Sequence, residues 1–135
     1  MAYKVEDIEG IGAARAKTLA AAGIATTADL LEKCGTAKGR KAIADQTAFS
    51  ERQLLTWANM ADLMRISGVA GEFSELLEAA GVDTVKELQH RNAENLATRL
   101  TEVNAEKKLT RRVPSSAEVS KWIAEAASLP PMVSH

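Results

Sequence analysis

The residues best suited to chemistry lie near the amino end, where two glycines flank an isoleucine and two cations follow. Gly10, Ile11 and Gly12 stand directly before a helix-forming stretch that carries Arg15 and Lys17. Unpaired N–H groups at the start of a helix, together with the helix dipole, favour an anion. Arginine or lysine within about one turn can reach neighbouring phosphates. The pattern therefore predicts an anion site that suits a nucleic-acid backbone.

Apolar and small residues are spaced regularly around these glycines: Val5, Ile8, Ile11, Ala16 and Leu19. We expect both glycines to adopt a positive φ, and the small Ala16 to let two helices approach closely. This spacing resembles the helix-hairpin-helix motif, which binds the DNA backbone without reading its sequence. The resemblance also implies that hairpin carbonyls can hold a monovalent cation. No other cofactor is expected.

A packing role without any ligand is the alternative for the same motif. Glu9 places a negative charge inside the hairpin, which is unfavourable next to a phosphate. A second copy at 66–77 has Ala70 in place of the second glycine, and its second helix carries three glutamates: Glu72, Glu75 and Glu78. We expect the second copy to be structural. For the hairpin at 8–19, binding and packing both stay open.

Further cations could extend a contact with phosphates. Lys38, Arg40 and Lys41 follow one another without an acid between them, and we assign them to the candidate site. A second basic cluster lies at 107–112. Solvated helix ends are the alternative explanation for both clusters. The net charge of −1 supplies no general attraction to nucleic acid, so any affinity must come from local patches.

Residues that could perform catalysis are few. His90 and His135 are the only histidines, and Cys34 is the only cysteine, with no histidine near it in sequence. No metal-binding or phosphate-loop spacing occurs. Asp62 and Arg65, three residues apart, are expected to form an exposed ion pair on a helix. We therefore predict that the chain is not an enzyme and has no catalytic residue, no metal site and no small-molecule substrate.

The chain repeats itself. Residues 8–31 correspond to residues 66–89 at an offset of 58, and the offset later becomes 65, as in Trp57 and Trp122. The second copy therefore holds seven extra residues, which we place between 91 and 114. Equivalent tryptophans on two amphipathic helices are best explained as core anchors. An internal repeat of this length predicts a fold made of two equivalent units.

The elements that must position these residues are all expected to be helices. Thr26 and Thr84 begin capping boxes for short helices at 28–33 and 85–89. Longer helices are expected at 39–47, after Ser50, after Asn92 and after Ser115. The prediction is an all-α fold of two tandem helix-hairpin-helix repeats, SAM-domain-like and packed into one compact body. Their expected bounds are 1–60 and 50–129, with a shared helix at about 50–65 and a disordered tail at 130–135.

Residues 3–129 resemble a bacterial family of unknown function built of tandem helix-hairpin-helix-like units. The resemblance rests on five segments: Ile8–Gly12, Ala22–Thr26, Ala61–Val69, Ala79–Leu88 and Arg112–Pro114. The resemblance implies no established activity. Wider relatives of the fold include DNA-contacting hairpin domains of repair proteins, recombinases and polymerases, which supports nucleic-acid binding by analogy of fold alone.

Two hypotheses of different classes follow. In the first, the chain binds DNA weakly and without sequence preference through residues 9–17. In the second, it is a helical interaction or scaffold module that binds a protein partner or forms a homo-oligomer, without nucleic acid. No stretch is long and apolar enough for a membrane, the amino end shows no signal arrangement, and the single cysteine suits a reducing compartment. We therefore expect a cytoplasmic location.

Overall fold

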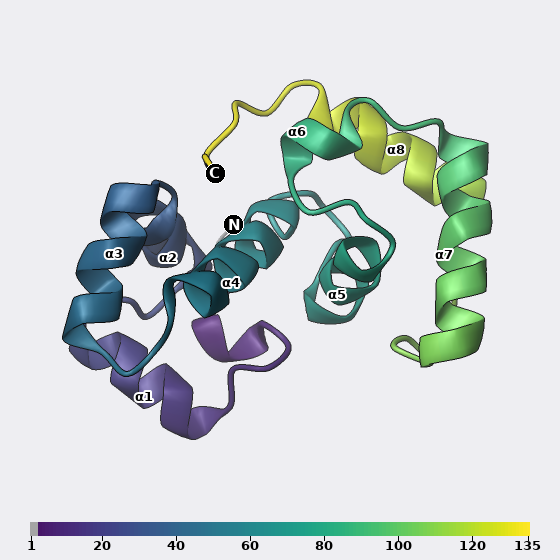
Figure 1. The fold of residues 1–135 in the computed structure, drawn as a ribbon. Coiled ribbons are helices and arrows are strands. Elements are labelled where there is room, and N and C mark those ends of the chain that lie inside the picture. The colour runs from purple at the N-terminus through teal and green to yellow at the C-terminus, as the bar shows by residue number, and fades with distance from the viewer. Residues whose placement is uncertain (1–2) are drawn as a thin grey trace.

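The computed structural model describes residues 3–135, so the first two residues of the expected 1–60 repeat lie outside it. In chain order the elements are the 3-10 helix η1 (Val5–Asp7) and the α-helices α1 (Ala13–Ala21), α2 (Thr27–Cys34), α3 (Ala37–Gln46), α4 (Glu51–Leu63), α5 (Gly71–Ala79), α6 (Val85–Leu88), α7 (Ala93–Lys107) and α8 (Ser116–Ala126) (Figure 1). The described residues form no strand, only one isolated antiparallel bridge between Lys4 and Thr26. The all-α prediction is confirmed. None of the described helices is long and apolar enough to cross a membrane.

Side-chain caps begin most of these helices. Thr26 accepts a hydrogen bond from the N–H of Asp29, and the Asp29 carboxylate accepts one in return, which completes the predicted capping box. Thr84 also accepts from the N–H of Glu87, but the Glu87 carboxylate binds Arg91 instead, so only half of the second box is present. The other side-chain caps are Thr36, Ser50, Asn92 and Ser115. The helix starts predicted from capping residues are confirmed, because local capping chemistry sets them. The helix predicted at 39–47 instead begins at Ala37, where Thr36 supplies a cap that was not predicted.

Helix α4 lies between two hydrophobic clusters. Trp57 and Met60 pack in the cluster that α1, α2 and α3 complete, whereas Leu63 packs in the cluster of α5, α6, α7 and α8. Figure 1 shows α4 at the centre with these two groups of helices on either side. We call η1 through α4 the first half and α4 through α8 the second half. Trp57 and Trp122 are 5% and 4% exposed, which confirms them as core anchors.

Glycines with positive φ occupy corresponding turns of the two halves. Gly10 and Gly68 have φ of 92° and 88°, and Gly23 and Gly81 have φ of 86° and 96°. The members of each pair are 58 positions apart. The expected positive φ at Gly12 is wrong. This residue is the N-cap of α1, with φ of −85° and ψ of −176°, an extended conformation that any residue can adopt.

Residues 130–135, expected to be a disordered tail, run back from α8 across the molecule to the first half (Figure 1). The N–H of Ser134 donates to the carbonyl of Gly35 at 2.8 Å, and the guanidinium of Arg40 donates to the carbonyl of Ser134 at 2.7 Å. Arg65 likewise donates to the carbonyl of Pro130 at 2.7 Å. The structure differs from the prediction because partly buried guanidinium groups need acceptors, and the carbonyls of this segment supply them.

Candidate functional site

The amino end of α1 has polar N–H groups without partners. Gly12 has no side chain to cap the helix, and the first bonded amide is that of Ala16, which donates to the carbonyl of Gly12 at 2.9 Å. Among the residues that the structure describes, the amides of Ala13, Ala14 and Arg15 donate to no other group. All three residues and Gly12 are exposed. An anion could therefore reach this helix end from solvent.

The amino end of α5 occupies the corresponding place in the second half but is covered. Its N-cap, Ala70, also lacks a side-chain cap, so α1 and α5 are the two described α-helices without one. Gly71 is buried, and a Cβ atom there would collide with the backbone carbonyl of Asp7 in η1. Glu72 adds a negative charge to the first turn. The start of α5 is thus closed to an anion by the arm of the first hairpin.

Arg15 contacts the hairpin and the core in addition to carrying a charge. One of its N–H groups donates to the carbonyl of Gly10 at 2.7 Å, and its guanidinium carbon lies 5.7 Å from the centroid of the Trp57 ring. The corresponding residue of the second half, Phe73, covers Trp122 in the same way with a centroid distance of 5.4 Å. A guanidinium has five N–H donors, so Arg15 can still bind an anion while it holds the hairpin.

The carbonyls of the first hairpin do not suit the monovalent cation that the motif implies. The carbonyl of Ile8 accepts from the N–H of Ile11 at 3.1 Å, and the carbonyl of Gly12 accepts from Ala16. The carbonyl of Gly10 accepts from the guanidinium of Arg15, which already supplies positive charge at that oxygen. The residues present do not fit a cation at the Gly10 oxygen, because the guanidinium of Arg15 would repel it.

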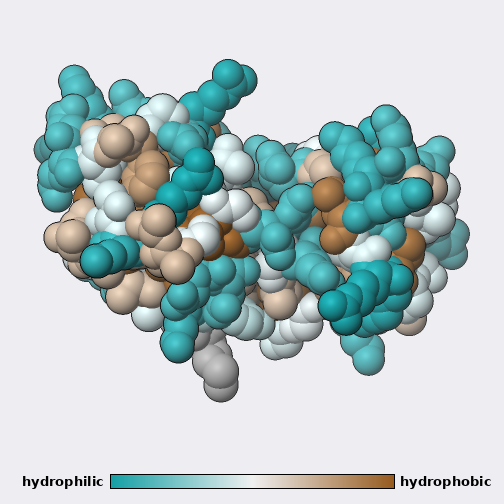
Figure 2. Space-filling model, turned by 90° about the horizontal axis from the view of Figure 1, so that it is seen from below, coloured by the Kyte–Doolittle hydropathy of each residue, from teal (hydrophilic) through white to brown (hydrophobic). Residues whose placement is uncertain are grey.

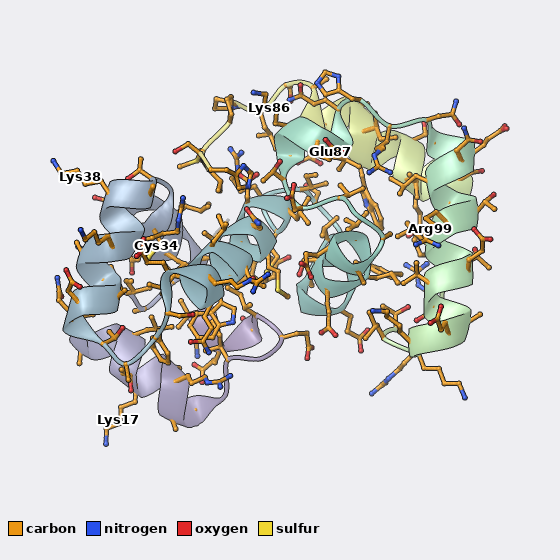
Figure 3. The ribbon with its side chains drawn as sticks, in the orientation of Figure 1. Lys17, Cys34, Lys38, Lys86, Glu87 and Arg99 are labelled. Atoms are coloured by element: carbon orange, nitrogen blue, oxygen red, sulfur yellow. The ribbon has the colours of Figure 1, made fainter. Side chains whose placement is uncertain are left out.

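The predicted site residues fall into two separate groups. Gly10, Ile11, Gly12, Arg15 and Lys17 lie together on the first hairpin and α1, with Ile11 buried beneath the turn. The other three predicted residues, Lys38, Arg40 and Lys41, lie on α3. Figure 3 shows Lys17 and Lys38 at opposite ends of the first half, both pointing into solvent. The structure therefore does not join the two groups into one surface.

Arg40 is not placed to contact a phosphate. Its side chain is buried, and the residue is 3% exposed. The guanidinium donates to the carbonyls of Cys34 and Gly35 at 3.0 and 3.2 Å, in addition to Ser134. These carbonyls end α2, where a cation is favoured by the helix dipole. The assignment of Arg40 to a binding site is therefore corrected, because its donors are used to join α2 to the chain's last residues.

Arg52 was missed by sequence reasoning. It is exposed on the first turn of α4 and lines the same cavity as Arg15, although the two residues are 37 positions apart. No described acid forms an ion pair with Arg15, Lys17 or Arg52. The one sequence signal that could have identified Arg52 lies in the repeat alignment, where the equivalent residue of the second half is the uncharged Ala117.

Acidic residues line the other side of the first hairpin. Asp7, Glu9 and Glu72 border a cavity of about 520 Å³ between the two hairpins. Burial raises the pKa of Glu75, and the nearby charges of Glu9 and Glu78 raise this pKa further. These carboxylates disfavour an anion in this cavity, whereas Arg15 and Arg52 favour one in the cavity that they line.

The comparisons with known proteins identify a family and nothing narrower. No curated protein and no solved structure matches the chain. The model of the family described as Domain of unknown function (DUF4332) matches residues 9–129, which is nearly the whole chain and ends just before the segment 130–135. The chain therefore belongs to the DUF4332 family of domains of unknown function.

Proposed function

We propose that the chain binds the sugar–phosphate backbone of DNA, weakly and without reading its sequence, and performs no catalysis. The observation that carries this proposal is the exposed amino end of α1, whose amides at Ala13 and Ala14 have no partner among the described residues. Arg15 and Lys17 stand within about one turn of these amides. Amides, helix dipole and cations together favour a phosphate more strongly than any of them alone.

We propose further that the chain consists of two helix-hairpin-helix repeats in a SAM-domain-like arrangement, which share α4. The matching φ values at Gly10 and Gly68 support this proposal, as do the missing side-chain caps of α1 and α5. In each half a tryptophan also lies close to the hairpin glycine. Under this proposal the first repeat binds DNA, and the second, whose helix end is closed by Asp7, supports the fold.

The affinity should be low and should depend on salt. The net charge of −1 gives no long-range attraction, and Glu9 opposes it locally. With about three phosphate contacts, counterion release predicts that affinity falls about 40-fold between about 50 and 200 mM salt. Binding should not differ between duplexes of unrelated sequence, because the proposed contacts reach only the backbone.

The replacement Gly12→Val tests the contact directly. No atom lies within 4 Å of the position where its Cβ would stand, and its backbone is extended, so the fold should tolerate valine. The branched side chain would cover the free amides and should weaken binding to a short duplex at least tenfold in fluorescence anisotropy. The matched control is Ala70→Val at the equivalent N-cap of α5, which should bind as the unaltered chain does.

Circular dichroism must show the same helical content for both variants. The proposal fails if the unaltered chain does not bind a duplex in low salt, or if Gly12→Val binds as tightly as Ala70→Val.

A helical interaction module is the second candidate, favoured by the acidic cavity of Asp7, Glu9 and Glu72. A protein partner with a basic surface would complement it. Self-association has less support. Seen from below, the surface in Figure 2 has strongly hydrophobic residues only in separate patches among hydrophilic ones. Among residues 3–135, Met132 is the only large hydrophobic residue that is strongly exposed. Sedimentation with and without a duplex separates DNA binding from the interaction module. The interaction module predicts an oligomer or partner complex and no DNA complex.

A further inference from the structure

A cavity of about 270 Å³ opens beside the first hairpin, between α1 and the amino end of α4. Six residues line it: Arg15, Ser50, Arg52, Gln53, Thr56 and Trp57. Two of them are arginines that reach the cavity from different helices. The side-chain oxygen of Gln53 accepts from the N–H of Ser50 at 3.0 Å, which leaves the amide group of Gln53 to donate elsewhere. The lining is therefore rich in donors of hydrogen bonds.

The two positive charges at this cavity are not neutralised by the chain. Neither Arg15 nor Arg52 forms an ion pair with a described acid. Arg15 is also held in place, because it donates to Gly10 and stacks over Trp57. Two guanidinium groups that face one cavity repel each other, and an anion between them removes that repulsion and gains charge-assisted hydrogen bonds. The cavity thus combines excess charge with a fixed donor.

The second half has no such charge at the corresponding place. The residues equivalent to Arg15, Arg52 and Gln53 are Phe73, Ala117 and Glu118. The Glu118 carboxylate is itself neutralised by Arg112, with an N–O distance of 2.7 Å. The second half therefore folds around its tryptophan without any free cation at these positions. Since neither arginine of the first half has an acidic partner among the described residues, their charge is available for a ligand.

We propose that this cavity binds a phosphate monoester, and specifically the terminal phosphate of a DNA strand; that strand is supplied by the proposed function of the first hairpin. A monoester carries a charge of about −1.5 to −2 at neutral pH and presents three oxygens. An internal phosphodiester carries a single negative charge and is flanked by sugars on both sides. The two guanidiniums match the monoester in charge, and Arg15, Arg52 and Gln53 offer a donor for each oxygen.

Two short duplexes of one sequence, with and without 5′-phosphates, test the proposal on the full chain. The phosphorylated duplex should bind about tenfold more tightly, which is the effect of one added charge-assisted contact. Arg52→Ala should remove this preference, so that the two duplexes bind with equal affinity. Arg52→Lys should restore part of it. The control is Arg99→Ala, an exposed arginine on α7, which Figure 3 shows far from Lys17 and α1.

Inorganic phosphate alone gives a second readout that does not depend on DNA. Because Trp57 lines the cavity, phosphate should change the tryptophan fluorescence of the unaltered chain, and this change should be absent in Arg52→Ala. If phosphate acts in this way while neither duplex binds, the cavity is a phosphate site and the proposed function fails. Equal affinity for the two duplexes together with no fluorescence response to phosphate overturns the cavity proposal, as does a preference that persists in Arg52→Ala.

Discussion

Asp62 on α4 accepts a hydrogen bond at 2.8 Å from the backbone N–H of Val85, the first residue of α6. The same carboxylate pairs with Arg65 at 2.6 Å. In the first half the equivalent amide, that of Thr27, donates instead to the backbone carbonyl of Tyr3 at 2.8 Å. The expected ion pair of Asp62 is confirmed, but its expected exposure is wrong because the residue is 1% exposed. The equivalent amide thus has an acceptor in each half, a backbone carbonyl in the first and a side-chain carboxylate in the second.

Asp62→Ala should lower the free energy of unfolding by about 3 kcal/mol, because it leaves a buried amide and a partly buried guanidinium without their acceptor. Urea unfolding followed by circular dichroism measures this loss. Asp45→Ala on α3 is the control, since this exposed carboxylate has no ion pair within residues 3–135. Similar losses in both variants would show that Asp62 does not join α4 to α6.

The two glycines of the first hairpin should respond differently to alanine. Gly10 has φ of 92°, so Gly10→Ala should cost about 1–2 kcal/mol of stability. Gly12→Ala should cost less, about 0.5 kcal/mol, since its backbone is extended and its Cβ position is open. Gly68→Ala should resemble Gly10→Ala, because its φ is 88°. Thermal unfolding of the three variants checks the order, and equal losses at Gly10 and Gly12 would contradict it.

Arg40 should matter for stability and not for binding. Arg40→Ala removes a buried guanidinium from three carbonyls and should lower the free energy of unfolding by about 2–3 kcal/mol. Lys38→Ala on the same helix should leave stability unchanged, because Lys38 is exposed and points into solvent (Figure 3). Proteolysis near residue 130 should also become faster in Arg40→Ala, since this residue holds Ser134. A stability equal to that of Lys38→Ala would refute this role.

The helices could be predicted from sequence because their signals are local. A threonine or serine followed by an acid or amide three positions later can mark the start of a helix, as at Thr26 and Ser115. The repeat adds a second reading of each turn, since Gly23 and Gly81 recur at the same offset of 58 as the residues around them. These inferences need no knowledge of which helices touch.

The remaining features depend on contacts between distant residues. A cluster of cations in sequence gives no sign that Arg40 is buried, because its partners come from α2 and from a segment 94 positions away. Arg52 reaches the candidate site only because α4 crosses α1 near Trp57. The conformation of Gly12 was misjudged because the motif names two glycines, whereas only the first needs a left-handed backbone. Composition alone predicts disorder for 130–135, because it does not show that Arg40 and Arg65 donate hydrogen bonds to the carbonyls of this segment.

Cys34 should be chemically inert in the folded chain. Its side chain is fully buried, and burial raises the pKa of this thiol to about 11. At pH 8 almost none of it is a thiolate, the reactive form. An aromatic disulfide reagent should therefore modify Cys34 slowly in buffer and rapidly in urea. Fast modification in buffer would show that the junction of α2 and α3 opens readily, which the packing of Arg40 against the Cys34 carbonyl argues against.

Glu118 should make stability depend on pH in acid. The hydrogen bond from Arg112, and then that from the N–H of Ser115, lower the pKa of Glu118 from 4.5 to about 2. A carboxylate with a lowered pKa in the folded state stabilises the fold fully above its unfolded pKa, and this contribution is lost as pH falls toward the folded value. The side chains of Arg112 and Glu118 are 61% and 35% exposed, so this contribution to stability should be small and should weaken with salt.

Glu118→Gln isolates this charge, because glutamine keeps the acceptor of the capping box, as Gln53 does at the equivalent place of the first half. The unaltered chain should be more stable than the variant by a constant amount above about pH 5, and the difference should shrink as pH falls toward about 2. Urea unfolding at several pH values measures the difference. If it stays constant down to pH 2, the Arg112 pair does not hold the carboxylate ionised, and the side chain of Glu118 acts only as a hydrogen-bonding cap.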